Sequence, residues 1–356
     1  MTAKRHRDTI GIDLGGSSIR IGLFDAAMNL LSSHSMPTRV AAGPQAAVDE
    51  IADAIRLLLH KVSGENHAYE PLGVGIGSPG PINLRSGILG LLPNLPGWDN
   101  FPLRDAMAEA IGLPVILECD ANAAAIAEWK LGSGTVTGTS SMVMITLGTG
   151  VGSDSILDGK VWHGMFGMGG EVGHTTVDPA GELCGCGSRG CLEMFASANG
   201  LLRLTRALAD SVVGTAALRE LVASPGGFTP LQVAGLAETG DHAARLAFER
   251  LGTYLGIGLA NLINTLDVPV IVVGGGVASA WPLFAESMFQ AIHAYSVVYR
   301  LAMPTQREIP ENDRTFICPA VLGSGAGLLG AALLPHLELA AQTIDPVVSQ
   351  IQEIAK

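Results

Sequence analysis

Two stretches of the chain have apolar segments on both sides of a glycine turn, and in the first of them the apolar residues alternate with other residues. From Thr9 to Asp25, isoleucine or leucine recurs at every second position on both sides of Gly15-Gly16. The same order returns from Ser141 to Leu157 around Gly148-Thr149-Gly150, with different side chains. A period of two predicts β-strands, and a glycine turn between two strands predicts a hairpin. We therefore expect two related domains, each of which opens with a strand–turn–strand unit.

The rest of the chain alternates between short apolar runs and longer segments with helical periodicity. The predicted strands are 72–76, 115–118, 270–273 and 317–321, and the predicted helices are 45–62, 102–111, 121–131, several within 198–266, 323–334 and 337–354. Strands that alternate with helices predict an α/β fold. We place a small α/β domain at residues 1–131, with the C-terminal helix 335–356 packing back on it, and a large α/β domain at 132–334.

Composition narrows the class of protein. Of the 356 residues, 48% are hydrophobic and 15% are charged, which is typical of a globular protein long enough for two domains. The net charge of −12 argues against non-specific binding to nucleic acid. No apolar run follows the basic N-terminus as in a signal peptide, and the most apolar stretch, Leu251 to Val277, is interrupted by polar residues and Pro269. We expect a cytoplasmic protein with neither a membrane span nor a nucleic-acid partner.

Both hairpin turns have the composition of phosphate-binding loops. Glycines let the backbone turn so that its amides face phosphate oxygens, Ser17 adds a hydroxyl donor, and Asp13 is a candidate Mg²⁺ ligand. A hairpin turn with an aspartate cap explains the first copy equally well, but the second copy favours a triphosphate, which needs more than one set of donors. Gly274-Gly275-Gly276 joins a predicted strand to a predicted helix, a position that suits a nucleotide. The ATP-binding candidates are Asp13, Gly15, Gly16, Ser17, Thr149, Gly150, Gly275 and Gly276.

Four potential metal ligands gather in one short segment. His174, Cys184, Cys186 and Cys191 lie within eighteen residues, and one imidazole with three thiolates satisfies a tetrahedral Zn²⁺. The alternative is a set of reduced structural cysteines in a reducing cytoplasm. Four protein ligands close the coordination sphere, so we expect a structural and not a catalytic zinc in a loop of the large domain. The other two cysteines, Cys119 and Cys318, are expected to be ordinary buried residues.

Asp120 is the candidate general base. It follows a predicted strand and opens a predicted helix, which suits either a helix N-cap or a carboxylate at the ligand-binding edge of an α/β sheet. Phosphoryl transfer to an alcohol needs a carboxylate near the attacking hydroxyl. Asn94, Asn122, Glu171 and Glu193 are polar groups suited to sugar hydroxyls, although a single acid is more often a solvated surface charge.

Together these segments resemble the ROK family (repressor, open reading frame, kinase), in particular its bacterial glucokinases and N-acylhexosamine kinases. The resemblance covers nearly the whole chain, and the cysteine segment is its most specific part. The matching segments are 13–20, 77–80, 93–98, 118–128, 147–152, 170–174, 184–193 and 274–277. The resemblance implies an actin-like ATPase (ribonuclease H-like) two-domain fold with a central cleft, and a homodimer.

The resemblance also implies an ATP-dependent hexose kinase that forms hexose 6-phosphate, with glucose as the leading substrate and Mg²⁺ as the partner of ATP. Asp120 would take the proton from the sugar 6-hydroxyl, and the two glycine loops would bind the phosphates of ATP. The sugar contacts would be Asn94, Asn122, Glu171, His174 and Glu193, with His174 also a zinc ligand.

Three alternatives stay open. The first is an N-acetylglucosamine or N-acetylmannosamine kinase, because the pattern around Glu193 also occurs with N-acetylated sugars in the family. The second is a transcriptional repressor, although about nine residues before the first loop are too few for a DNA-binding domain. The third is a sugar sensor without turnover. Asp154, in a position where the family has glycines and an apolar residue, favours the sensor, and the retained Asp120 favours the kinase.

Overall fold

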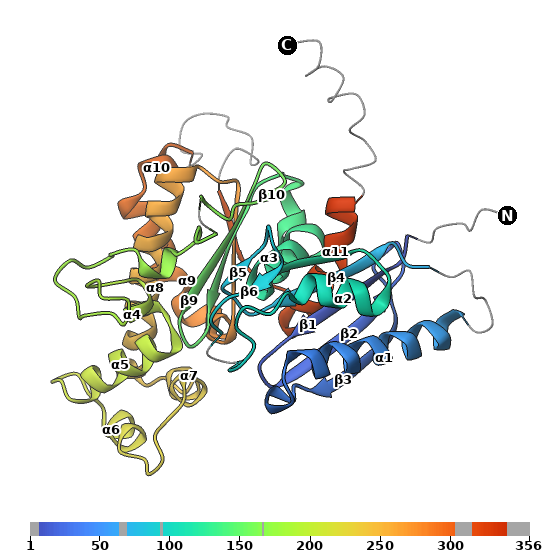
Figure 1. Ribbon diagram of the computed structural model, residues 1–356. Coiled ribbons are helices and arrows are strands. Elements are labelled where there is room, and N and C mark those ends of the chain that lie inside the picture. Colours follow the sequence, from blue (N-terminus) through green and yellow to red (C-terminus); the bar gives the residue numbers. More distant parts are fainter. Residues whose placement is uncertain (1–6, 64–69, 93–94, 166, 303–314, 340–356) are drawn as a thin grey trace. The chain divides into compact units, whose positions relative to one another are not determined.

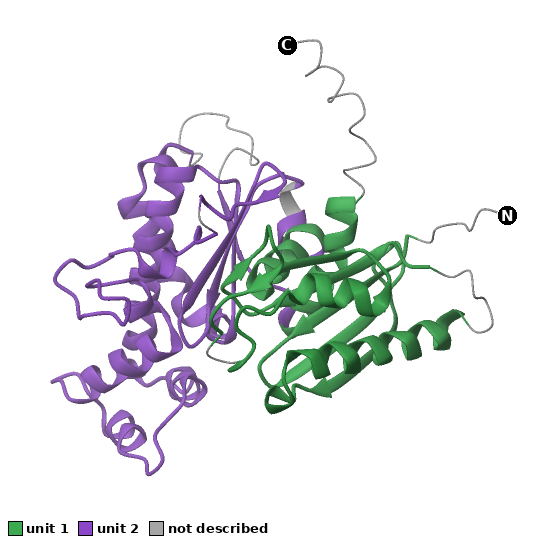
Figure 2. Ribbon diagram, in the orientation of Figure 1, with its two compact units in different colours: residues 1–130, 324–356 green, residues 131–323 purple. Residues whose placement is uncertain are grey.

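The computed structural model describes residues 7–63, 70–92, 95–165, 167–302 and 315–339. The chain divides into two compact units, residues 1–130 with 324–356 and residues 131–323 (Figure 2). Each unit contains a five-stranded sheet and its own apolar core.

The sheet of the first unit has the strand order β3-β2-β1-β4-β7 (Figure 1). Its strands are β1 (Thr9–Leu14), β2 (Ser18–Phe24), β3 (Leu30–Pro37), β4 (Gly73–Ser78) and β7 (Val115–Cys119), and β5 (Ile82–Asn83) pairs with β6 (Ile88–Leu89) in a separate hairpin. β1 pairs antiparallel with β2 and parallel with β4, and β4 pairs parallel with β7. The first predicted hairpin is confirmed, and the carboxyl ends of β1, β4 and β7 lie at one edge of the sheet.

Four helices accompany this sheet: α1 (Pro44–Ser63), α2 (Leu103–Ile111), α3 (Asp120–Leu131) and α11 (Ala326–Leu339). The apolar stripe of α1 buries Val48, Ile51 and Ile55, as its periodicity predicted. α11 crosses β1 and β4 so closely that a Cβ at Gly75 would lie 1.8 Å from the carbonyl oxygen of Ala331. Glycine at this strand position is therefore what lets the helix backbone reach the sheet.

The sequence divided the α11 region into helices 323–334 and 337–354. The structure instead has one helix, Ala326–Leu339, that runs through Pro335 and belongs to the first unit, while the second unit ends at Gly323. Because Leu333, Leu334 and Pro335 are buried, their packing outweighs the one hydrogen bond that proline removes from the helix. The predicted helical residues beyond 339 lie outside the described residues.

The second unit repeats the topology of the first, with the strand order β10-β9-β8-β11-β12. Its strands are β8 (Met142–Leu147), β9 (Val151–Leu157), β10 (Lys160–Val161), β11 (Val270–Gly274) and β12 (Phe316–Pro319). β8 pairs antiparallel with β9 and parallel with β11, and β11 pairs parallel with β12. The second hairpin and the repeat predicted from the two strand–turn–strand stretches are confirmed.

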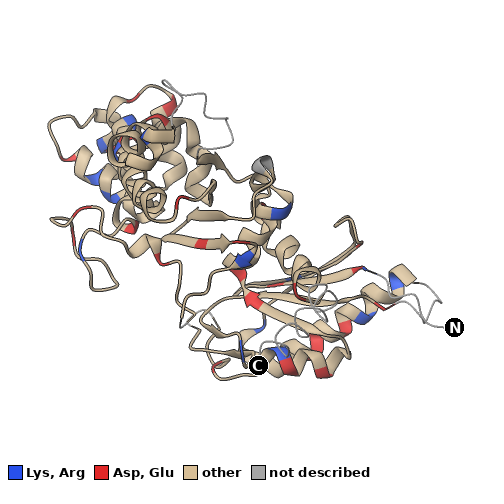
Figure 3. Cartoon of the chain, turned by 90° about the horizontal axis from the view of Figure 1, so that it is seen from above, with Lys and Arg blue, Asp and Glu red and all other residues tan. Residues whose placement is uncertain are grey.

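The helices of the second unit are α4 (Glu193–Ala196), α5 (Ala198–Ala209), α6 (Ala216–Val222), α7 (Pro230–Glu238), α8 (His242–Leu266), α9 (Trp281–Tyr295) and α10 (Val297–Ala302). α8 is the central helix and packs along α9, and α5 to α7 gather around one end of it (Figure 1). Acidic and basic positions are interspersed over the helices of both units (Figure 3). Within the described ranges, no helix has the length and apolarity that a bilayer crossing needs.

Candidate active site

The site residues predicted in the first unit gather at the carboxyl edge of its sheet. Asp13 pairs in register with Gly77 on the neighbouring strand, and Gly77 pairs with Glu118 on the strand beyond. A Cβ on Gly77 would lie 3.4 Å from the Cα of Asp120. The glycine loop after β1 and the start of α3 therefore lie at the same edge, on either side of β4.

The first glycine loop, Gly15 to Ser17, is a tight turn held by its own hairpin and by β3. The N–H of Gly15 donates to the carbonyl of Ser18 at 2.9 Å, and the hydroxyl of Thr38 donates to the carbonyl of Gly15 at 2.6 Å. Arg20, opposite Asp13 in the register, donates from Nε to its Oδ2 at 2.9 Å and pairs with it through Nη2. The candidate Mg²⁺ ligand is thus held beside the loop by a guanidinium.

Asp120 is the first residue of α3, where the predicted strand–helix junction lies. Its Oδ1 accepts from the N–H of Ala121 at 2.8 Å and from the thiol of Cys119 at 3.5 Å. Cys119 was expected to be an ordinary buried residue, but it is only partly buried and contacts the candidate base instead. Among the residues that the structure describes, these hydrogen bonds engage Oδ1 and not Oδ2 of the Asp120 carboxylate.

Glu118 is a site residue that the sequence did not single out. Its carboxylate is buried, and Oε1 accepts from the Asn122 side-chain amide at 2.9 Å and from the N–H of Cys119 at 2.8 Å. Since the amide nitrogen of Asn122 is engaged, its carbonyl oxygen is the end oriented for a ligand hydroxyl. The predicted sugar contact Asn94 lies outside the described residues.

The second glycine loop, Gly148 to Gly150, joins β8 to β9. The N–H of Gly148 donates to the carbonyl of Gly150 at 2.9 Å, as the equivalent turn bond does in the first loop. Two groups from outside the sheet hold it: the N–H of Ala198 donates to the carbonyl of Gly148 at 2.8 Å, and the carboxylate of Glu193 accepts from the N–H of Val151 at 3.0 Å. Asp154, which the sequence left close to this loop, is buried within β9 opposite Met144.

A cavity of about 460 Å³ lies beside the second loop. Its lining comes from this loop, from α5, α7 and α8, and from the segment after β11: Leu147, Gly148, Thr149, Ala198, Leu201, Thr229, Pro230, Leu231, Ala234, Phe248, Gly276, Val277, Ser279 and Ala280. The lining is mainly apolar, and its volume suits a nucleoside. Thr149 and Gly276 bring two predicted nucleotide segments to this one cavity.

Gly275 is required where it stands. Its φ is +90°, and an added Cβ would lie 2.5 Å from the carbonyl oxygen of Leu147, the last residue of β8. Only glycine combines that conformation with so close an approach to the neighbouring strand. The turn after β11 is therefore fixed against the start of the second glycine loop.

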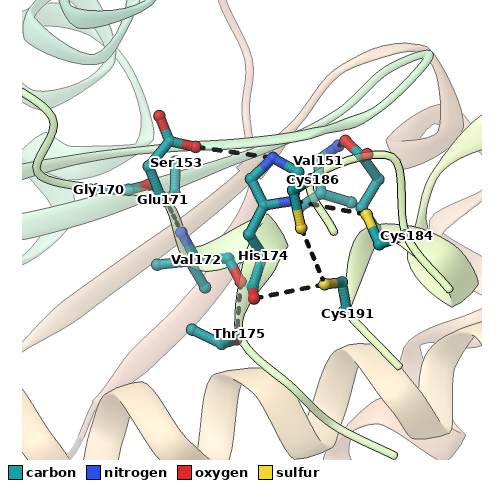
Figure 4. A network of polar contacts seen from close by, with 11 residues as sticks. Val151, Ser153, Gly170, Glu171, Val172, His174, Thr175, Cys184, Cys186 and Cys191 are labelled. Atoms are coloured by element: carbon teal, nitrogen blue, oxygen red, sulfur yellow. Dashed lines mark hydrogen bonds and ion pairs between the residues drawn. The ribbon is translucent and has the colours of Figure 1, made fainter. Parts of the chain in front are cut away.

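His174, Cys184, Cys186 and Cys191 form one cluster, in which their ligand atoms all lie within 4.8 Å of one another (Figure 4). The Sγ atoms of Cys186 and Cys191 are 3.6 Å apart, and Cys184 Sγ lies 3.7 Å from His174 Nδ1. A tetrahedral zinc with Zn–S bonds of about 2.3 Å places its sulfur ligands roughly 3.8 Å apart. The cluster thus has the ligand set and the spacing of a Cys₃His metal site.

The environment of the cluster matches metal binding. The backbone N–H of Ser188 lowers the pKa of the exposed Cys186 thiol to about 7, whereas burial raises the pKa of Cys191 to about 12. A divalent cation would offset the cost of the buried thiolate. His174 Nδ1 faces the sulfur of Cys184, and Nε2 lies 3.9 Å from a carboxylate oxygen of Glu171 (Figure 4).

The predicted site residues fall into two groups, one in each unit. The first unit holds Asp13, Gly15, Gly16, Ser17, Asp120 and Asn122, and the second holds Thr149, Gly150, Glu171, His174, Cys184, Cys186, Cys191, Glu193, Gly275 and Gly276. Sequence reasoning missed the apolar lining of the cavity. Leu231 and Phe248 carry no local motif, and only the packing of α7 and α8 brings them beside the second loop.

Two α/β units of the same strand order, each opening on a hairpin with a glycine turn, define the actin-like ATPase fold. Carboxylates at a sheet edge and glycine loops are typical of the active site of a phosphotransferase with this fold. The chain belongs to the ROK family, whose family model matches residues 9–338.

Several curated relatives cover nearly the whole chain. A glucokinase of Halalkalibacterium halodurans is 35% identical over 91% of this chain and 94% of its own length. An N-acetylmannosamine kinase of Escherichia coli is 32% identical over 93% of this chain and 99% of its own. The crystal structure of a ROK family glucokinase from Streptomyces griseus, in complex with glucose and AMPPNP, is 34% identical with a TM-score of 0.64, over 92% of this chain and 98% of that one.

Proposed function

We propose that this protein is an ATP-dependent hexose kinase that converts glucose to glucose 6-phosphate. The observation that carries the proposal is the sheet edge of the first unit, where Asp120 stands across β4 from the Gly15–Ser17 loop. Transfer of a phosphoryl group to an alcohol requires a carboxylate that can accept the hydroxyl proton and a loop that binds the phosphates at the same edge. The names of the glucokinase relatives support glucose as the acceptor.

The second unit supports ATP as the donor. Its apolar cavity of about 460 Å³ would hold the nucleoside, with Thr149 and Gly150 next to the phosphates and the Gly275-Gly276 turn on the other side. In the first unit Gly15, Gly16 and Ser17 would contribute further donors, and Asp13 would hold Mg²⁺ directly or through water. Mg²⁺ would neutralise charge on the phosphates during transfer.

In the proposed reaction, Asp120 takes the proton of the sugar 6-hydroxyl as the oxygen attacks the γ-phosphorus, and ADP leaves. Asn122, whose amide nitrogen is held by Glu118, accepts from a neighbouring hydroxyl. Asn94, Glu171, His174 and Glu193 complete the sugar contacts. The Cys₃His cluster would hold a structural Zn²⁺ that fixes His174 and the loop that leads to Glu193.

A coupled ADP-release assay with Mg-ATP tests the proposal against glucose, mannose, fructose, allose, N-acetylglucosamine and N-acetylmannosamine. Turnover of glucose well above the others is the expected result. Preference for N-acetylmannosamine would favour the second candidate, which the Escherichia coli relative supports. If no sugar is turned over but thermal shifts still show sugar binding, the protein is a sugar sensor and not a kinase.

A further inference from the structure

The backbone of Val151, directly after the second glycine loop, is contacted from two sides. On one side, a Cβ on Gly173 would lie 2.1 Å from the carbonyl oxygen of Val151, so the backbone there is in close contact. On the other, Glu193 Oε2 accepts from the N–H of Val151 at 3.0 Å. Gly173 directly precedes His174, and Glu193 follows Cys191 by two residues. Both segments that carry the metal cluster therefore touch the same residue of the loop.

Glu193 also fixes the loop itself. A Cβ on Gly150 would lie 2.2 Å from Glu193 Oε2, which places the carboxylate directly against the loop. Five residues later in the chain, the N–H of Ala198 donates to the carbonyl of Gly148 at 2.8 Å. The segment from Glu193 to Ala198 thus holds both ends of the Gly148–Gly150 loop.

The two segments around Val151 are joined to each other at the metal cluster. Leu192 donates its N–H to the carbonyl of Thr175 at 2.9 Å. The thiol of Cys191 lies 3.4 Å from the carbonyl oxygen of His174 (Figure 4). A metal bound by His174 and Cys191 would add a covalent-strength link to these two contacts. The distance between Gly173 and Glu193, and with it the position of Val151, would then depend on the metal.

We propose that the Cys₃His metal positions the second glycine loop for phosphate, with Glu193 as the positioning residue that transmits its effect. The inference rests on the proposed function, because it takes the loop to bind the phosphates of ATP. Besides its proposed sugar contact, Glu193 would hold the Val151 amide and Gly150 in place. Metal loading should therefore set the affinity for the nucleotide even when no sugar is present.

Calorimetric titration of Mg-AMPPNP without sugar tests this in the full-length protein. Glu193→Ala should bind AMPPNP about tenfold more weakly, equivalent to about 1.4 kcal/mol. Glu193→Gln should lose less, since its amide oxygen still accepts from Val151. The matched control is Glu182→Ala, in the segment between His174 and Cys184. The Glu182 side chain is 74% exposed, so this variant should bind AMPPNP with unchanged affinity. Wild type stripped of metal by a chelator that is then dialysed away should weaken like Glu193→Ala, and added Zn²⁺ should restore it.

The outcomes separate the inference from the proposed function. Unchanged AMPPNP affinity in Glu193→Ala that keeps its metal, or in metal-free wild type, would overturn the inference and leave the kinase proposal standing. Wild type that binds no AMPPNP with metal present would overturn both. If Glu193→Ala does not fold, Gly150→Ala takes its place, because the new methyl group must displace the Glu193 carboxylate.

Discussion

The two glycine loops occupy the same place in two sheets of the same strand order, yet they are held in different ways. In the first, Gly15 to Ser17, the supports come from the hairpin and its neighbouring strand: the Asp13–Arg20 ion pair and the Thr38 hydroxyl. In the second, Gly148 to Gly150, they come from outside the sheet: Glu193 and Ala198. The described side-chain supports of the first loop therefore come mainly from its own sheet, apart from the bond that Arg20 donates to the carbonyl of Ser324, whereas the second loop also needs the segment that carries the metal cluster.

The difference in support suits the two loops to different parts of the proposed reaction. In the first unit, Asp13 on β1 and Asp120 at the start of α3 lie at the edge where the parallel strands end, which is where we propose that phosphoryl transfer takes place. The second unit has an apolar cavity and a loop set by contacts of long sequence separation, which suits binding more than proton transfer. A change at Asp120 should therefore alter kcat, and changes around the second loop should alter nucleotide affinity.

The largest expected effect is that of Asp120→Asn. It removes the base but keeps an acceptor oxygen for the N–H of Ala121, so the fold should persist. General base catalysis contributes about 10²–10⁴-fold, and kcat for glucose should fall by that factor while the affinities for glucose and AMPPNP stay within about twofold. Steady-state kinetics with calorimetric binding measures both. A kcat within a few-fold of wild type would show that Asp120 is not the general base. It would also contradict the assignment of proton transfer to the first unit.

The next effect is on stability, and it should be confined to the second unit. Cys186→Ser should release the metal, and losses of a structural metal are among the largest single-residue effects, about 4 kcal/mol. The Tm of that unit should fall by roughly 8–16 °C, measured by calorimetry together with metal analysis. Cys318→Ser, on β12 outside the cluster, is the control and should keep the metal. A metal-free Cys186→Ser protein with unchanged Tm would contradict the structural role.

Local patterns along the chain were sufficient to predict the elements on which both loops stand. A period of two around Gly15-Gly16 predicted the first hairpin, and the same strand–turn–strand order around Gly148-Thr149-Gly150 predicted the second. The short spacing from His174 to Cys191 predicted a cluster that the fold does bring together. The contact between Glu193 and Val151 was out of reach, because it joins residues 42 positions apart through packing that no local signal encodes. The continuity of α11 through Pro335 depends likewise on its burial against β1 and β4.

A smaller effect should follow from removing the ion pair that supports the first loop. Arg20→Ala leaves Asp13, whose side chain is only 15% exposed, without its guanidinium partner. Charge-assisted hydrogen bonds in partly buried places contribute about 1–2 kcal/mol, so unfolding by urea should show a loss of that order. Arg39→Ala breaks the exposed pair with Glu50 and serves as the matched control, with a loss below about 1 kcal/mol. Equal losses in the two variants would mean that the loop does not depend on the pair.

The smallest expected effect is on the pH dependence of the unfolding free energy, through α11 of the first unit. Burial lowers the pKa of His336 on α11 below its ordinary 6.5, and Nε2 lies buried with no hydrogen-bond partner in the described part of the chain. Below pH 6.5 the unfolded chain therefore binds a proton that the folded protein rejects, so stability falls as the pH drops through that value and is regained above it.

Urea unfolding of wild type and His336→Gln at pH 7.5 and pH 5.5 isolates this contribution. The difference in unfolding free energy between the two pH values should be smaller in the variant, because glutamine does not titrate. The effect should be on the stability of the first unit, since the helix carrying His336 belongs to that unit and packs mainly on β1 and β4 of its sheet. The same pH dependence in both proteins would show that His336 is not the group responsible for it.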